Sequence, residues 1–240
     1  MSTEPRVIAV ASGRGGSGKT TVAVALGDLL ARSGRRVALV DLDTQGSMAT
    51  YLGLSRATDP LNEAPREAHG MRIFAGGIPL SQANAEQISD HIARATVDAD
   101  VVLVDCPPDV TSPSHTALLE YPANLFLAVA RLEPGTPPPL QTLTGLATAH
   151  NVPFLVLPNV EASGRANSLG VLIALQALYS GEQVMPNGAS VSQLLKGIPD
   201  AQWAPSSIAK RVPVTTLRPK APITGAFASV AADLVNWGLV

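Results

Sequence analysis

Long apolar runs alternate with segments of helical character along most of the chain. Several of the apolar runs, among them residues 101–104, are continuously hydrophobic. Strands covered on both faces have this composition, whereas strands with one solvated face alternate apolar and polar residues. The predicted strands cover residues 6–11, 36–41, 72–75, 101–105, 125–130 and 154–158, with a weaker candidate at 213–216.

The segments between these runs have the length and composition of helices. They cover residues 20–32, 82–95, 114–120, 140–150, 169–179, 190–196 and 223–237. The alternation of strands and helices predicts an α/β fold with a doubly wound, mainly parallel sheet and right-handed crossovers. Sheets of this kind bind ligands at the carboxyl ends of their strands.

The composition narrows the class of protein. With 240 residues, 46% of them hydrophobic, the chain can form one sizeable core, and we expect one domain over residues 1–240 with a disordered tail at residues 1–5. The net charge of −2 excludes a polycation. The single cysteine, Cys106, excludes an intrachain disulfide and fits a reducing cytosol. We expect no signal peptide and no membrane-spanning segment.

Residues 12–21 read SGRGGSGKTT and lie between the first predicted strand and the first predicted helix. They fit the phosphate-binding loop pattern G-x-x-x-x-G-K-[ST]. Glycines let backbone N–H groups surround a polyphosphate, and the helix N-terminus behind them attracts it. A flexible Gly/Ser linker is the alternative, which this position disfavours. The predicted nucleotide-binding residues here are Gly13, Arg14, Gly15, Gly16, Ser17, Gly18, Lys19, Thr20 and Thr21.

Three acids follow predicted strands. Asp41 and Asp43 lie at the end of the second strand, and Asp105 ends the apolar run 101–104. Beside a Mg²⁺–triphosphate, such carboxylates hold metal-bound water or orient the attacking water. The alternative for the first two is helix capping and turn formation. Cys106, next to Asp105, is expected to be a small buried residue, because the chain offers it no companion cysteine and no suitably placed base.

Together, these motifs resemble those of the deviant-Walker ATPases of the ParA/MinD group, and in particular the short ParA-type proteins that partition plasmids, chromosomes or other cargo. The resemblance rests on GRGGSGKTT, on DLDTQG from Asp41 and on VDCPP from Val104, and it covers nearly the whole chain. It implies a P-loop NTPase fold of the deviant Walker (SIMIBI) type. It also implies ATP and Mg²⁺ as ligands, an ATP-dependent sandwich homodimer, DNA binding without sequence preference, and a ParB-like or other cargo adaptor that stimulates hydrolysis.

The resemblance also assigns roles to residues. Lys19 would hold the β and γ phosphates, Thr20 would bind Mg²⁺, Asp43 would position the attacking water, and Asp105 would support the metal shell. Asp43 is included among the metal-site residues, and both Asp43 and Asp105 would contact Mg²⁺ through water molecules. Two less specific matches concern the adenine base of ATP. Asn159 ends a strand that resembles the family's strand beside adenine. Pro213 and Val214 resemble the family's segment that closes over the other side of adenine.

The sequence departs from the family at two positions. Arg14 stands where the family has its signature lysine, which crosses the dimer interface to the partner's nucleotide. Arginine has the same charge and binds phosphate bidentately. Three outcomes are open: a working finger in trans, a tighter but slower ATP dimer, or loss of the contact. Thr44 stands where the family usually has proline, which softens the turn after Asp43.

The charges are distributed unevenly. Between Lys196 and Lys220 there are five bases and one acid. The resemblance connects this basic patch with DNA, and an ordinary solvated surface is the alternative.

No Lys or Arg follows Lys220, so we expect a packed C-terminal helix and no stable membrane anchor. The expected location is the cytoplasm, on the nucleoid in the ATP state. The DNA-contact candidates are Arg165, Lys196, Lys210, Arg211, Arg218 and Lys220.

Three functions therefore compete. The first is a weakly active, DNA-associated partition or positioning ATPase. The second is a slowly hydrolysing switch whose output is ATP-dependent dimerisation, with little DNA binding. The third is a metabolic P-loop kinase or ligase. A branch that ligates an iron–sulfur cluster is disfavoured, because such clusters need several cysteines and the chain has one.

Overall fold

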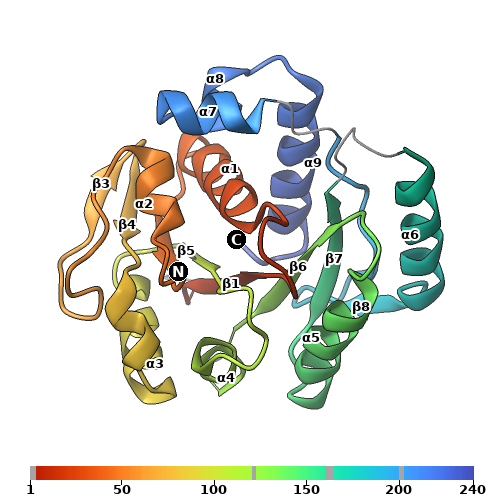
Figure 1. The fold of residues 1–240 in the computed structure, drawn as a ribbon, viewed down its shortest axis with the longest axis horizontal. Coiled ribbons are helices and arrows are strands. Elements are labelled where there is room, and N and C mark those ends of the chain that lie inside the picture. Colours follow the sequence, from red (N-terminus) through yellow and green to blue (C-terminus); the bar gives the residue numbers. More distant parts are fainter. Residues whose placement is uncertain (1–3, 121–122, 160–164, 200–202) are drawn as a thin grey trace.

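A computed structural model describes residues 4–120, 123–159, 165–199 and 203–240 (Figure 1). Its main sheet has the strand order β3-β4-β2-β5-β1-β6-β7. All neighbours in it pair in parallel except β3 and β4. The predicted doubly wound, mainly parallel sheet is confirmed. The strands are β1 (Arg6–Ala11), β2 (Val37–Asp41), β3 (Arg66–Ala68), β4 (Met71–Phe74), β5 (Val101–Asp105), β6 (Leu125–Arg131) and β7 (Phe154–Asn159).

Helices cover both faces of this sheet, with α1, α8 and α9 on one face and α3, α4 and α5 on the other (Figure 1). Of the predicted disordered tail, residues 1–3 lie outside the described residues, and Glu4 and Pro5 precede β1. The helices are α1 (Lys19–Arg32), α2 (Ser47–Leu52), α3 (Ala85–Thr96), α4 (Pro113–Glu120), α5 (Pro137–Ala149), α6 (Arg165–Leu178), α7 (Ala204–Lys210), α8 (Val214–Leu217) and α9 (Pro222–Asn236), with a 3₁₀ turn η1 (Ile78–Gln82).

The central strand shows why the strand-like runs are continuously apolar. Successive side chains of a strand point to opposite faces. Val7 and Ala9 therefore enter the core under α3, α4 and α5, while Ile8 and Val10 enter the core under α1 and α9. All four are at most 2% exposed, because both faces of the sheet are covered. Packing in these two cores fixes the positions of the strands, and with them the strand ends where the phosphate loop and the three acids lie.

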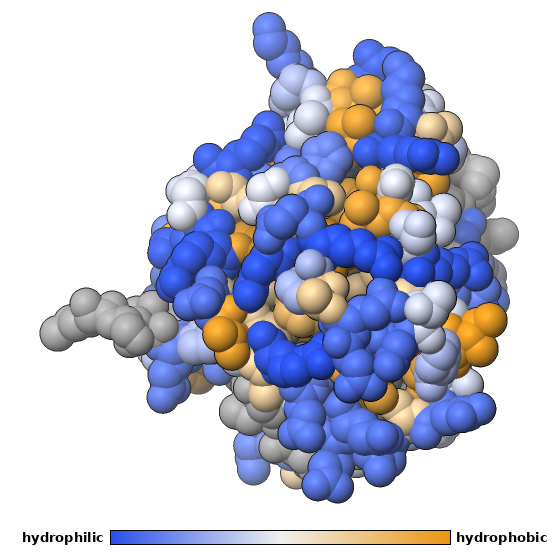
Figure 2. Space-filling view, turned by 90° about the vertical axis from the view of Figure 1, so that its left-hand side faces the viewer, coloured by the Kyte–Doolittle hydropathy of each residue, from blue (hydrophilic) through white to orange (hydrophobic). Residues whose placement is uncertain are grey.

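Both edges of the sheet are protected. At one edge, β3 has three residues and carries Glu67 on its exposed side, and short charged edge strands discourage pairing with other chains. Figure 2 shows this side of the molecule, where hydrophilic residues predominate and hydrophobic ones appear in several small groups. At the other edge, the chain after β9 (Ser190–Ser192) runs along β7, since Leu195 N–H donates to Val156 O (2.8 Å).

Two element predictions were wrong. Residues 190–196 form no helix: β8 (Glu182–Val184) and β9 (Ser190–Ser192) make a hairpin, and the following residues extend beside β7. Residues 213–216 form no strand, because Thr215 and Thr216 in α8 donate hydrogen bonds to Asp28 of α1, at 2.6 and 3.0 Å. Pairing with β7 outweighed local helix propensity in the first case, and a buried carboxylate anchored a helix in the second.

The short elements β3, α2 and α7 were not predicted, because each has too few residues to show a period. In the described parts of the chain, no helix is long and apolar enough to cross a membrane.

Candidate nucleotide site

The strand order brings the three sequence motifs to one edge of the sheet. β5 lies between β2 and β1, and Asp105 pairs in register with Asp41 on one side and with Val10 on the other. The loop after β1 and the acids that end β2 and β5 are therefore neighbours, as the parallel sheet predicted.

The loop after β1 has the backbone of an anion-binding loop. Gly16 and Gly18 have φ angles of 71° and 94°, which glycine adopts without strain. A Cβ on Gly13 would lie 2.3 Å from the Pro139 Cβ, so only glycine fits there. Inside the loop, the buried Ser17 hydroxyl donates to Ser12 (2.8 Å).

Helix α1 begins at Lys19, directly after this loop. Its N-cap is Gly18, which has no side chain to bind the first N–H groups of the helix. Those N–H groups and the positive end of the helix dipole favour an anion at this position. Lys19 itself is only 6% exposed, and its charge acts on the buried carboxylate of Asp105.

Thr20 and Asp105 form the predicted metal pair. The Thr20 hydroxyl donates to Asp105 Oδ2 at 2.5 Å. The other carboxylate oxygen, Oδ1, is buried and has no hydrogen-bond partner among the described residues. Burial raises the pKa of Asp105 to about 6. A hydroxyl beside a buried, under-coordinated carboxylate is an oxygen donor set that fits Mg²⁺.

The two acids of the β2 end have different environments. Asp41 is fully buried, and its two oxygens accept the N–H groups of Asp43 and Met48, each at 3.0 Å. Burial raises its pKa well above the ordinary value. Asp43 is half-buried and accepts the Gln45 N–H (2.9 Å). Asp41 therefore ties the turn to the start of α2, whereas Asp43 is left facing a cavity.

That cavity measures about 640 Å³, a size typical of small-molecule sites. It is bounded by the phosphate loop at Gly15 and Gly16, by the turn containing Asp43 and Thr44, and by the segment 107–114 after β5. Cys106 is buried beside this segment, and burial raises the pKa of its thiol. The thiolate is disfavoured there, which fits the expectation that Cys106 is not a nucleophile.

Comparison with known proteins agrees with this geometry. Residues 8–212 match the CobQ/CobB/MinD/ParA nucleotide binding domain. The chromosome-partitioning ATPase Soj of Thermus thermophilus is 32% identical over 70% of this chain and 78% of its own length. The chromosome partitioning protein ParA of Caulobacter vibrioides is 35% identical over 46% of this chain and 51% of its own. The chain belongs to the ParA/MinD family of ATPases.

The fold of this ATPase is similar to that of a protein whose structure has been solved. The septum site-determining protein MinD of Pyrococcus horikoshii, solved in complex with Mg-ADP, superposes with a TM-score of 0.76 at 20% identity, covering 96% of each chain. This likeness supports the fold assignment, and the resemblance inferred from the motifs is confirmed by the family match.

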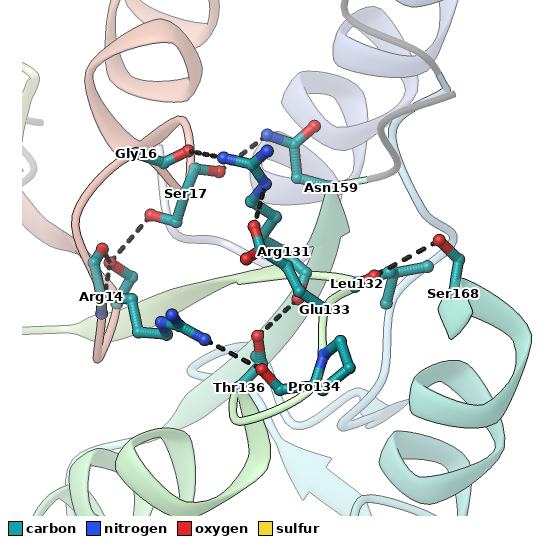
Figure 3. A network of polar contacts seen from close by, with 11 residues as sticks. Arg14, Gly16, Ser17, Arg131, Leu132, Glu133, Pro134, Thr136, Asn159 and Ser168 are labelled. Carbon is teal, nitrogen blue, oxygen red and sulfur yellow. Dashed lines mark hydrogen bonds and ion pairs between the residues drawn. The ribbon is translucent and has the colours of Figure 1, made fainter. Parts of the chain in front are cut away.

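Arg14 of the ATPase lies on the rim of the site. Its side chain is exposed, and Nη1 donates to the carbonyl oxygen of Pro134 at 2.9 Å (Figure 3). Pro134 belongs to the connection between β6 and α5. The signature-position cation is therefore bound to its own chain, through one exposed hydrogen bond.

Sequence reasoning missed Arg131, the last residue of β6. Its Nη1 donates to the Gly16 carbonyl (3.2 Å), and its Nε pairs with Glu133. No motif contains Arg131. The one sequence feature that could have identified it is a cation at the carboxyl end of a buried strand. Asn159, predicted to lie beside adenine, donates from Nδ2 to the Ser17 carbonyl at 2.7 Å.

Pro213 and Val214, predicted to close over the base, lie at the start of α8. Val214 is fully buried in the core with α1 and α9, and Pro213 precedes it as the N-cap of α8. The Val214 side chain is therefore occupied by packing, and the base-closing role of both residues stays a prediction that depends on their backbone.

The basic residues do not form one cluster. Lys210 ends α7, Arg211 is the residue after it, and Arg218 follows α8, where its guanidinium stacks on Trp203 at 4.0 Å. Lys196 lines a separate groove beside α9, and Arg165 begins α6, which lies at the right-hand edge of the molecule in Figure 1 while α7 lies at the top. The exposed candidates are Lys196, Lys210, Arg211, Arg218 and Lys220.

Proposed function

We propose that this ATPase binds ATP with Mg²⁺, forms a sandwich homodimer with nucleotide at the interface, and positions a cargo along DNA. A ParB-like or other adaptor on the cargo would stimulate hydrolysis. The proposal takes residues 1–240 as one domain and places it in the cytoplasm, on the nucleoid in the ATP state. The observation that carries it is the Thr20–Asp105 contact beneath the uncapped start of α1.

The residues of the site divide the work of hydrolysis. Lys19 and the loop N–H groups would neutralise and orient the β and γ phosphates. Thr20 and Asp105 would hold the Mg²⁺, which supplies charge neutralisation at the phosphates when bound. Asp43, which borders the cavity beside the loop, would orient the attacking water and accept its proton. Closing the cavity with a second copy of the chain would exclude bulk water.

Arg14 is proposed to reach the partner's nucleotide in that dimer. Its hydrogen bond to Pro134 is exposed, so leaving it costs little free energy. The same contact favours the second candidate function, a slow dimerisation switch, because an Arg14 that stays on Pro134 would contribute nothing to hydrolysis in trans.

DNA binding is proposed for the surface of α7 and the α8–α9 connection. Lys210, Arg211, Arg218 and Lys220 are all exposed there, and dimerisation would double their number against the phosphate backbone. Lys196 and Arg165 are weaker candidates, because they lie outside this surface.

One experiment separates these functions. The mass of the particle and its retention on arbitrary DNA are measured with ADP, ATP and a slowly hydrolysed ATP analogue, for the wild type, Arg14→Ala and Lys19→Ala. ATP turnover of the same proteins is measured with and without that DNA, to see how far DNA stimulates it. We expect an ATP-dependent dimer retained on DNA in a salt-sensitive way, lost in Lys19→Ala, with stimulated turnover lost in Arg14→Ala.

Other outcomes decide against parts of the proposal. Dimers without DNA retention or stimulated turnover support the switch. Wild-type turnover in Arg14→Ala contradicts the trans role. A chain that stays monomeric with ATP and phosphorylates a metabolite contradicts both.

A further inference from the structure

Two side chains at the ends of neighbouring strands contact the phosphate loop from the same side (Figure 3). Arg131 ends β6 and Asn159 ends β7, and the two are partners in the parallel register of those strands. They donate to the carbonyls of Gly16 and Ser17, at 3.2 and 2.7 Å. Their placement is set by the sheet, so their reach to the loop does not depend on a ligand.

The two carbonyls belong to consecutive peptide units. In a trans peptide the N–H points away from the C=O, and the described residues contain no cis peptide. Holding the carbonyls of Gly16 and Ser17 toward β6 and β7 therefore turns the N–H groups of Ser17 and Gly18 away from those strands. Converging N–H groups near glycines with positive φ form an anion-binding concavity.

Both contacts are specific in geometry. Arg131 binds Gly16 with Nη1 while Nε pairs with Glu133, so the two contacts use two nitrogens held in one fixed plane, whereas a lysine would have to make both from a single nitrogen. Asn159 lies so close to the loop that a Cβ on Gly18 would be 2.4 Å from its Nδ2.

We propose that Arg131 and Asn159 form a carbonyl clamp that holds the phosphate loop in its anion-binding conformation before a nucleotide arrives. Arg131 is thereby a positioning residue of the site, and Asn159 acts on the phosphate loop instead of on the base. The proposal rests on the proposed function of this loop as a nucleotide site.

Pyrophosphate distinguishes the clamp from a base contact, because it has phosphates and no base. The affinities of ADP and pyrophosphate, both with Mg²⁺, are measured by displacement of fluorescent ADP from the full chain. We expect Asn159→Ala to weaken both by about fivefold, the effect of one neutral hydrogen bond. Weakened ADP binding with unchanged pyrophosphate binding makes Asn159 a base contact and overturns its part in the clamp.

Arg131 needs a control for its charge. Arg131→Met is expected to weaken both ligands by about tenfold, and Arg131→Lys to remain about threefold weaker than wild type because a single lysine nitrogen lacks the fixed planar fork that contacts Gly16 and Glu133 in the wild type. Full recovery in Arg131→Lys means that a single cationic nitrogen suffices at this position and contradicts the need for the guanidinium fork. The matched control is Arg36→Met, which removes an exposed ion pair with Asp100 at the amino ends of the strands and should change neither affinity.

The unliganded variants should melt close to the wild type, since Arg131 is a third exposed. A wild type that binds neither ADP nor pyrophosphate contradicts the proposed function itself. A wild type that binds both, with Arg131→Met and Asn159→Ala unchanged, contradicts the clamp alone.

Discussion

The two halves of the site differ in what their side chains contact. In the acidic half, at the ends of β2 and β5, Asp43 borders an open cavity and Asp105 keeps one oxygen without a partner among the described residues. In the clamp half, at the ends of β6 and β7, Arg131 and Asn159 both bind backbone carbonyls of the loop. One half leaves oxygen atoms available to a ligand, and the other fixes the loop that would hold it.

This difference explains which residues a sequence reveals. Metal and water chemistry requires carboxylates at defined positions, so the acidic half has a recognisable pattern. A backbone carbonyl accepts a hydrogen bond from any donor that reaches it, so the carbonyl contacts of the clamp half have no such pattern; Asn159 was noticed only through a resemblance to a strand beside adenine. The predictions below test the contrast in order of expected effect.

The largest effect is expected for Asp43→Asn. Because an amide cannot accept a proton from the attacking water, turnover should fall about a hundredfold, the order of a lost general base. Phosphate release measures turnover, and displacement of fluorescent ADP should show a dissociation constant within about twofold of wild type.

Asp90→Asn, an exposed change on α3, is the matched control and should leave turnover unchanged. Near-wild-type hydrolysis in Asp43→Asn would mean that the acidic half orients no water and that another group bordering the cavity does so.

The fold was predictable where local pattern and sheet packing agree. Ile8 and Val10 lie in a run that is apolar on both faces, and the structure buries both faces. The phosphate loop and Asp105 were found because glycine spacing and a strand-terminal acid are local signals. Arg131 could not be found, since its contact with Gly16 joins residues 115 positions apart. The helix predicted for residues 190–196 was wrong for the same reason, because pairing with β7, which is distant in sequence, decides their conformation.

Asp41→Asn should affect stability and not turnover. Both of its carboxylate oxygens accept backbone N–H groups, and an amide nitrogen would face one of those donors. We expect the free energy of unfolding to fall by about 2 kcal/mol, the cost of a buried unsatisfied donor, as measured by urea denaturation.

Asp43→Asn serves here as the comparison, because Asp43 is only half-buried, and its stability should change by less than about 0.5 kcal/mol. Equal destabilisation by the two changes would contradict the division of labour between these acids.

Gly13→Ala tests how closely the loop fits the β6–α5 connection. The new methyl group would meet Pro139 at 2.3 Å, and because Pro139 lies in α5 the backbone must shift. We expect a loss of about 1.5 kcal/mol in urea denaturation, in the range of overpacking. Gly15→Ala is the control, since a Cβ there meets nothing within 4 Å. Similar losses in both variants would assign the effect to glycine flexibility and not to the fit.

The smallest effect is expected for Arg14→Ala on the unliganded protein. Arg14 contributes one exposed hydrogen bond to Pro134, so the free energy of unfolding should change by less than about 0.5 kcal/mol. Urea denaturation without nucleotide measures it, with Arg36→Met as a second exposed arginine change for scale. A loss above about 1 kcal/mol would show that Arg14 is a fixed part of the clamp half. Only a weakly held arginine can leave Pro134 when a second copy of the chain approaches, so a small effect is the condition for its proposed role in trans.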